Sequence, residues 1–250
     1  MSEIDKQYAR LFRLQDDPVR QEYMEWLNFL VNIDVISEAL KVCATTEFPE
    51  DSISPLYVTF ALNLQNYFIN AQGLLENNKF ISGSEQPRRF KALTTIAKSV
   101  RNKVAHKGVW IATPVRGVVS GKGLYSFYSY PIEDLKESLE EMKNRELSRD
   151  LKRENNRGVL EKKRYKIEEK YSLAFELLEN QYQDDLFYIL EFMKLHYKDF
   201  VGYILIEYRK KLKKKGFERY SALRKEAGYR AIEDRIESIK SVYDDLCEGL

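Results

Sequence analysis

Apolar residues recur every three or four positions along most of this chain, a spacing that places them on one face of an α-helix. Two such stripes begin directly after Asp17-Pro18 and Ser54-Pro55, where an N-cap residue precedes a proline suited to the first helical position. Their apolar positions are Trp26, Leu30, Ile33, Ile36, Leu40 and Cys43, then Ala61, Leu64, Phe68, Ala71 and Leu75. The pattern predicts two long helices that pack as antiparallel neighbours.

A third stripe predicts a helix after a loop that contains Gly83, Ser84 and Pro87. Its apolar positions are Leu93, Ile96, Ala97, Val100 and Val104. The stripe ends near Gly108, a residue type that often follows a helix C-terminus. From Val109 to Tyr130 the spacing changes to that of two strands around a Gly-rich turn, which predicts a β-hairpin.

Beyond the hairpin the chain returns to helical spacing. Pro131 opens a charged helix that runs to about Arg157, where Asn155, Asn156 and Gly158 indicate a break. The apolar positions of the helices that follow are Ile167, Tyr171, Ala174 and Leu178; Leu186, Ile189, Met193, Phe200, Ile204 and Tyr208; and Ile232, Ile236, Ile239 and Leu246. We therefore expect an all-α protein in two regions, a helical bundle with a hairpin over 1–130 and a charged helical region over 131–250.

Composition narrows the function classes only a little. Hydrophobic residues make up 44% of the 250 residues, enough for a core, and Gly (11) and Pro (6) are scarce, which favours helices. The net charge of +2 does not by itself indicate a nucleic-acid binder. Cys43 and Cys247 match neither a disulfide framework nor zinc spacing, and no segment has the features of a signal peptide or membrane span. These features predict a cytoplasmic protein without a metal, a cofactor or a membrane partner.

The end of the third helix holds the clearest candidate site. Arg101, Asn102 and His106 fall within a turn and a half, and Lys103 and Lys107 add positive charge. Cleavage of RNA without a metal requires a base, an acid and positive charge on the phosphate. Histidine serves either proton role near neutral pH, and arginine can hold two phosphate oxygens.

One histidine cannot be both acid and base in the same step, so a two-fold dimer that brings two copies of His106 and Arg101 together would supply both roles. Asn102 lies four residues before His106 and could orient its ring. The alternative is a helix end without chemistry, where all three side chains face solvent and His106 caps terminal carbonyls.

The run from Arg101 to Gly108 resembles the signature of the HEPN superfamily, in which an arginine, a polar residue and a histidine end a helix of a four- or five-helix bundle. The resemblance covers about residues 1–130. It implies a metal-independent endoribonuclease that acts as a homodimer, with Arg101 and His106 catalytic and Asn102 supporting. It also implies a role as a toxin or an antiviral defence effector, with an antitoxin or another regulator as a further partner. Some members of the family only bind RNA or nucleotide and mediate dimerisation, which is the alternative function.

Two basic clusters lie in the second region. The first consists of Arg209, Lys210, Lys211, Lys213, Lys214 and Lys215, and aromatic residues follow it. It could bind an RNA backbone, complement the dipole of its own helix, or dock an acidic partner protein. The second consists of Lys152, Arg153, Arg157, Lys162, Lys163, Arg164 and Lys166. It has acidic neighbours, so we expect it to be a solvated helix face. His196 lies on an apolar helix and is expected to be buried and hydrogen-bonded rather than catalytic.

Overall fold

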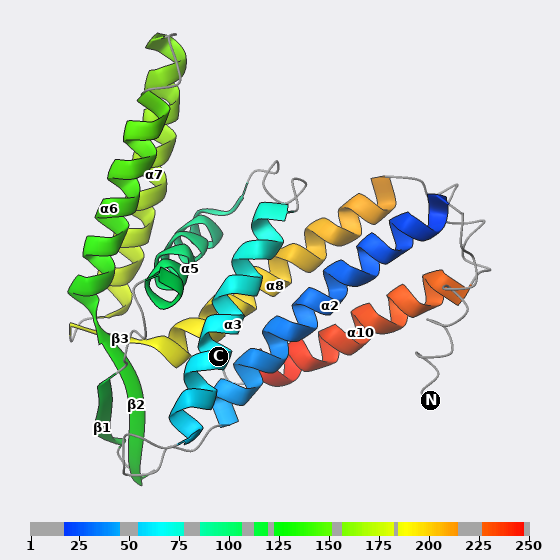
Figure 1. Cartoon of the computed structure of the whole chain (residues 1–250), viewed down its shortest axis with the longest axis horizontal. Coiled ribbons are helices and arrows are strands. Elements are labelled where there is room, and N and C mark those ends of the chain that lie inside the picture. The colour runs from blue at the N-terminus through cyan, green and yellow to red at the C-terminus, as the bar shows by residue number, and fades with distance from the viewer. Residues whose placement is uncertain are drawn as a thin grey trace.

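The computed structural model describes residues 18–45, 55–77, 86–106, 113–119, 123–151, 157–182, 185–214 and 227–247. This part of the chain contains seven helices and one small antiparallel sheet (Figure 1). The predicted all-α class is therefore confirmed. None of the described helices combines the length and the apolar character that crossing a bilayer requires.

Prolines in the sequence locate three helix starts, but the charged helix expected to run to about Arg157 ends at Leu151, and Arg157 begins the next helix. The helices are α2 (Pro18–Thr45), α3 (Pro55–Asn77), α5 (Arg88–His106), α6 (Ile132–Leu151), α7 (Arg157–Gln181), α8 (Ile189–Lys214) and α10 (Ala227–Cys247). The first two begin at the predicted prolines, and α6 begins directly after Pro131. A proline at the first helical position loses no hydrogen bond, which explains the starts at Pro18 and Pro55, whereas Pro131 is the last residue of the preceding strand.

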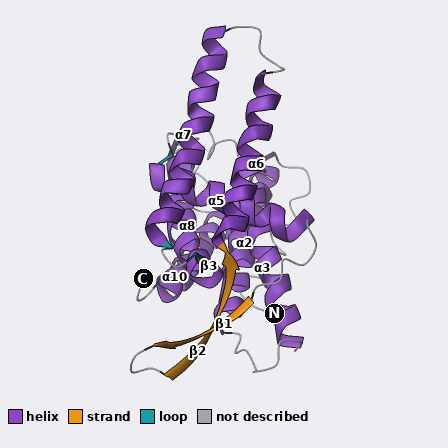
Figure 2. Ribbon diagram, turned by 90° about the vertical axis from the view of Figure 1, so that its left-hand side faces the viewer, coloured by secondary structure: helices purple, strands orange, loops and turns teal. Residues whose placement is uncertain are grey.

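The predicted hairpin is present as β1 (Thr113–Val119) and β2 (Gly123–Pro131). The two strands pair antiparallel, with Val118 opposite Leu124 (Figure 2). A third strand, β3 (Leu186–Tyr188), pairs with the end of β2 and places Phe187 opposite Tyr130. Both of these aromatic side chains are buried, so the short sheet joins the hairpin to the helical core.

The third strand corrects one expectation from the sequence. Leu186 was assigned to a helix with Ile189, but it lies in β3, and α8 begins only at Ile189. Asp185 has a positive φ of 58°, a conformation that Asp tolerates better than most residues. Its carbonyl oxygen accepts a hydrogen bond of 3.0 Å from the backbone N–H of Ile132. This pairing with the end of β2 extends the chain where side-chain periodicity alone indicated a helix.

One hydrophobic core runs through the described helices. Buried residues such as Ile33, Phe68 and Ile96 from the first region lie in the same cluster as Leu178 and Phe192 from the second. The core therefore continues across the boundary expected near residue 130. Helices from both regions pack as one body, because α5 contacts α6, α7 and α8, and α10 contacts α2.

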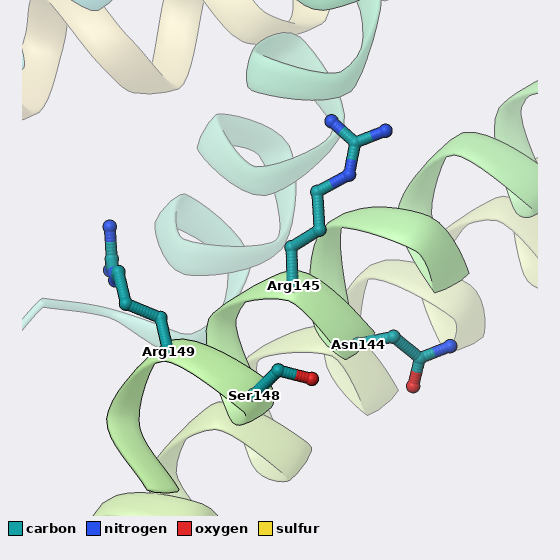
Figure 3. A pocket seen from close by; sticks show the side chains of 4 residues that line it. All are labelled: Asn144, Arg145, Ser148 and Arg149. Atoms are coloured by element: carbon teal, nitrogen blue, oxygen red, sulfur yellow. The ribbon is translucent and has the colours of Figure 1, made fainter. Parts of the chain in front are cut away.

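Helices α6 and α7 form a two-helix hairpin that extends away from the other helices (Figures 1 and 2). Helix α5 packs against the base of this hairpin. On the far half of α6 an open hollow of about 460 Å³ is lined by Asn144, Arg145, Ser148 and Arg149 (Figure 3).

Candidate functional site

Helix α5 carries the motif and is enclosed by other helices along much of its length. It contacts α3, α6, α7 and α8. Leu93, Ile96 and Val100 are buried, as the apolar stripe predicts, and Val104 packs against the same core while partly exposed. Arg101 and Asn102 follow this buried stripe near the C-terminal end of the helix.

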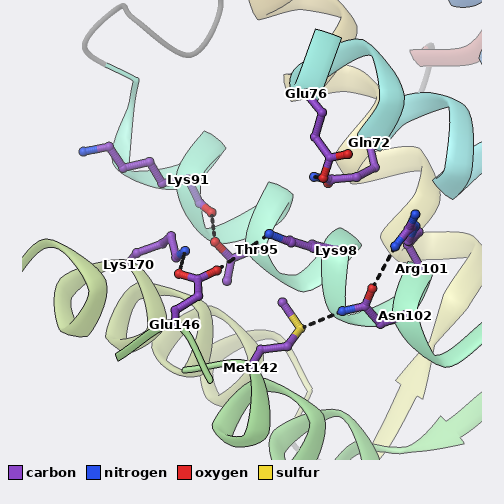
Figure 4. Close-up of polar contacts among 10 residues, drawn as sticks. All are labelled: Gln72, Glu76, Lys91, Thr95, Lys98, Arg101, Asn102, Met142, Glu146 and Lys170. Carbon is purple, nitrogen blue, oxygen red and sulfur yellow. Dashed lines mark hydrogen bonds and ion pairs between the residues drawn. The ribbon is translucent and has the colours of Figure 1, made fainter. Parts of the chain in front are cut away.

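Arg101 and Asn102 are joined to each other near that end. The Nη1 atom of Arg101 donates a hydrogen bond of 3.2 Å to Oδ1 of Asn102 (Figure 4). The Nδ2 atom of Asn102 in turn contacts Sδ of Met142 on α6 at 3.3 Å (Figure 4). Both polar side chains are half-buried, so the amide orients the guanidinium and connects it to the base of the α6–α7 hairpin.

Helix α5 ends at His106, but the His106 side chain and all of Lys107 lie outside the described residues. The expected hydrogen bond between Asn102 and the imidazole ring therefore stays a prediction. Among the described residues the Asn102 amide contacts Arg101 and Met142.

The lysines and arginines proposed to bind RNA have different surroundings. Lys103 is only 8% exposed, so its ammonium group offers little surface to a ligand. Lys210 is exposed and donates a hydrogen bond of 2.7 Å to Glu207 one turn earlier on α8. The remaining members of the cluster lie outside the residues whose side chains are described: Arg209, Lys211, Lys213, Lys214 and Lys215.

An ion network joins three helices beside the motif. Glu146 on α6 accepts a hydrogen bond of 2.5 Å from Nζ of Lys170 on α7 and lies 3.6 Å from Nζ of Lys98 on α5 (Figure 4). Burial opposes ionisation of this glutamate. The hydrogen bond and charge of Lys170, with the charge of Lys98, nevertheless hold the pKa of its carboxyl below the ordinary value. The network fixes α5 at the base of the hairpin.

His196 is a core residue, as the sequence predicts. It is 1% exposed and packs against Phe192 and Phe200. Its Nδ1 atom lies 2.9 Å from the hydroxyl of Tyr67, which donates its own hydrogen to the carbonyl oxygen of Met193. Burial lowers the pKa of His196 to about 3, so the ring is neutral at physiological pH.

Sequence reasoning missed the contacts that hold the motif in place. Met142 and Glu146 lie about 40 residues beyond the motif, on a helix whose charged surface gave no sign of contact with α5. The sequence did show Met142 and Glu146 four residues apart on one face of a helix, but it did not indicate which helix this face would contact. Among the described residues, no group of three His, Cys, Asp or Glu side chains lies close enough together to hold a metal ion.

Comparison with known proteins adds no relative to this picture. No protein-family model matches the chain, and neither the curated proteins nor the solved structures compared with it give a match.

Proposed function

We propose that this protein is a metal-independent endoribonuclease that acts as a homodimer, with Arg101 and His106 of two copies in one composite site. The observation that carries the proposal is the Arg101–Asn102 pair at the end of a helix enclosed by four others. A guanidinium held by a neighbouring amide is oriented before the substrate arrives, which is the arrangement that stabilises charge in a transition state. The HEPN resemblance of the same residues supports this interpretation.

The proposed reaction is transesterification within the RNA backbone. One neutral His106 takes the proton of the 2′-OH as that oxygen forms a bond to phosphorus. The bond from phosphorus to the 5′-oxygen breaks, and a protonated His106 of the second copy gives its proton to that oxygen. Arg101 stabilises the negative charge on the phosphoryl oxygens. The products are a 2′,3′-cyclic phosphate and a 5′-hydroxyl, and DNA is not cut because it lacks the attacking 2′-OH.

A surface on α2 and α3 supports the dimer that this reaction requires. The exposed aliphatic side chains on these two neighbouring helices are Val31, Val35, Val58, Leu62 and Ile69. Between Pro55 and Leu75 the sequence has no charged residue, although 32% of the chain is charged. In a two-fold dimer a surface meets its own copy, so the uncharged α3 part of this surface avoids repulsion between like charges. A second copy of this chain therefore fits the surface better than a charged partner does.

The dimer is tested by placing a charge on that surface. Leu62→Glu brings two like charges together across a two-fold axis, so we expect it to shift the protein from dimer to monomer in sedimentation analysis. Ile206 on α8 is also exposed, and Ile206→Glu is the matched control. A wild-type monomer, or equal sedimentation of both variants and the wild type, would contradict the proposed interface.

A binding module without catalysis is the second candidate function. Asn102 contacts Met142, and Lys103 is buried. A helix end without a catalytic role would show the same two features. Such a module binds RNA or nucleotide equally well with and without His106.

The proposed biological role of the ribonuclease is that of a toxin or antiviral defence effector, restrained by an antitoxin or another regulator.

The deciding experiment is RNA cleavage by the purified protein in excess EDTA. We expect wild-type cleavage that leaves 2′,3′-cyclic phosphate ends and a loss of about 10²- to 10⁴-fold in His106→Ala and Arg101→Ala. Lys240→Ala changes an exposed charge on α10 and serves as the control. Binding without cleavage by every form favours the binding module. If no form of the protein binds or cuts RNA, the result favours a helical interaction protein that docks an acidic partner.

A further inference from the structure

In the described part of the far half of the α6–α7 hairpin no side chain is fully buried, and Leu147 packs against the hydrophobic core while it stays partly exposed. Buried side chains end at Met142 on α6 and begin again at Ile167 on α7, and none of the described side chains between them is buried. At about 1.5 Å per residue, the ten residues of α7 from 157 to 166 extend for about 15 Å. Because burial of apolar surface does not explain this extension, we infer that its exposed side chains have a binding role.

That surface is strongly basic. The described residues 144–151 and 157–166 include seven basic and three acidic residues, a net formal charge of +4, whereas the whole chain carries +2. The other residues together are therefore net acidic. We refer to residues 144–151 and 157–166 as the basic arm. Glu146 faces the ion network at the arm's base, while Arg145 and Arg164 pair with Glu141 and Glu168, which lie just outside the arm.

Hydrogen-bond donors line one side of the basic arm. The open hollow on α6 is formed by Asn144, Arg145, Ser148 and Arg149 (Figure 3). Arg145 is also bonded to Glu141 at 3.1 Å, which leaves other donors of its guanidinium for a ligand. Two guanidinium groups beside an amide and a hydroxyl match the oxygen atoms of a phosphodiester.

An exposed aromatic side chain lies among the cations of α7. Tyr165 is 67% exposed, the highest value among the large apolar and aromatic residues that are exposed in the described chain. Lys162 precedes it by one turn, and Lys166 follows it directly, both exposed. An aromatic ring beside cations is the combination with which proteins bind single-stranded nucleic acid, since bases stack on the ring while the cations hold the backbone.

We propose that the basic arm is a binding surface for single-stranded RNA, whose phosphates contact its cations and one of whose bases stacks on Tyr165. The inference rests on the proposed ribonuclease for the identity of its ligand. Met142 contacts Asn102 of the motif, and Arg149 lies seven residues further along α6, or about 10 Å. One short RNA strand therefore spans the arm and the end of α5. The arm positions the substrate, and the motif cuts it.

The test is binding of fluorescein-labelled oligouridine to the full chain, measured by fluorescence anisotropy over a series of NaCl concentrations in the His106→Ala background. We expect Tyr165→Ala to weaken binding by about 5- to 150-fold, the effect of losing one stacked base, and Tyr165→Phe to restore it. Lys162→Gln with Lys166→Gln should lower the slope of log affinity against log salt by about 1.4, the value for two lost phosphate contacts.

The matched control removes two exposed lysines far from the arm, Lys41 on α2 and Lys240 on α10, each replaced by Gln. The proposal is overturned if the arm variants bind like this control, or if polyglutamate binds to the arm and oligouridine does not. The latter result would assign the arm to an acidic protein partner.

Cleavage assays separate the two proposals. If the arm variants bind and cut RNA as well as the wild type does, the role of the arm is refuted and the proposed ribonuclease activity is not. If the wild type binds RNA through the arm but cuts no RNA, the proposed ribonuclease activity is refuted and the role of the arm in RNA binding is not. Circular dichroism melting confirms that the variants, all at exposed helical positions, remain folded.

Discussion

Replacing Glu146 with Gln should loosen the base of the α6–α7 hairpin from α5. The side chain is 17% exposed, and it loses a charged hydrogen bond to Lys170 and the attraction of Lys98. Hydrogen bonds to charged groups contribute about 1.5–3 kcal/mol. The two lysine side chains are 31% and 38% exposed, so water screens part of the interaction, and we expect a loss of about 1–2 kcal/mol. In a chain of this size that lowers the melting temperature by about 2–8 °C.

The same interaction makes a specific prediction about pH. The pKa of Glu146 is lower in the folded protein than the ordinary value of 4.5. Its contribution to stability is therefore complete above pH 4.5 and is lost as the pH falls through the folded-state pKa. The difference in unfolding free energy between wild type and Glu146→Gln should be largest at pH 7 and should shrink on acidification below pH 4.5.

Urea unfolding followed by circular dichroism at several pH values measures this difference. Glu133 lies on the same helix and pairs with Lys136, but it is mostly exposed, so Glu133→Gln is the matched control, with an expected effect below about 0.5 kcal/mol. Equal effects of the two substitutions at pH 7 would refute the reasoning. So would an effect of Glu146→Gln that stays constant as the pH falls.

Three further predictions follow from other contacts. Because burial lowers the pKa of His196 to about 3, the unfolded state binds a proton that the folded state excludes, and stability should fall below pH 6.5 by up to about 1.4 kcal/mol per pH unit. Urea titrations should show that His196→Phe removes this component. Gly73→Ala should stabilise α3 by about 0.5–1 kcal/mol in thermal melts because its Cβ meets no atom within 4 Å. Gly202→Ala should gain less, since its Cβ lies 3.2 Å from Oη of Tyr243. Asn102→Ala should lower kcat for RNA cleavage by about tenfold, with little change in KM, because it releases the motif guanidinium.

Local signals predicted much of the fold and part of the candidate site. Pro18 and Pro55 mark helix starts because proline lacks the N–H that a first turn does not use, and Pro131 directly precedes a third start. The apolar stripe of α5 is buried from Leu93 to Val100, as its period predicts, and Val104 packs against the core while partly exposed. Helical spacing placed Asn102 beneath His106 and Arg101 on a neighbouring flank, and it did not predict the hydrogen bond between Arg101 and Asn102 that the structure shows. The assignment of Leu186 to a helix was wrong, because pairing with β2 outweighed local periodicity.

By itself, the sequence determined the helical class, the order of the helices and of the first hairpin, and the residue types at the end of α5, since these depend on contacts between residues close along the chain. The tertiary structure decided which distant groups meet. It brought Met142 to Asn102 and Glu146 to Lys98, over separations that no periodicity encodes. It also distinguished two kinds of charged helix surface. The cations near Tyr165 lie beyond the last buried residue of the hairpin, whereas Lys103 is enclosed, because burial depends on the packing of whole helices and not on local composition.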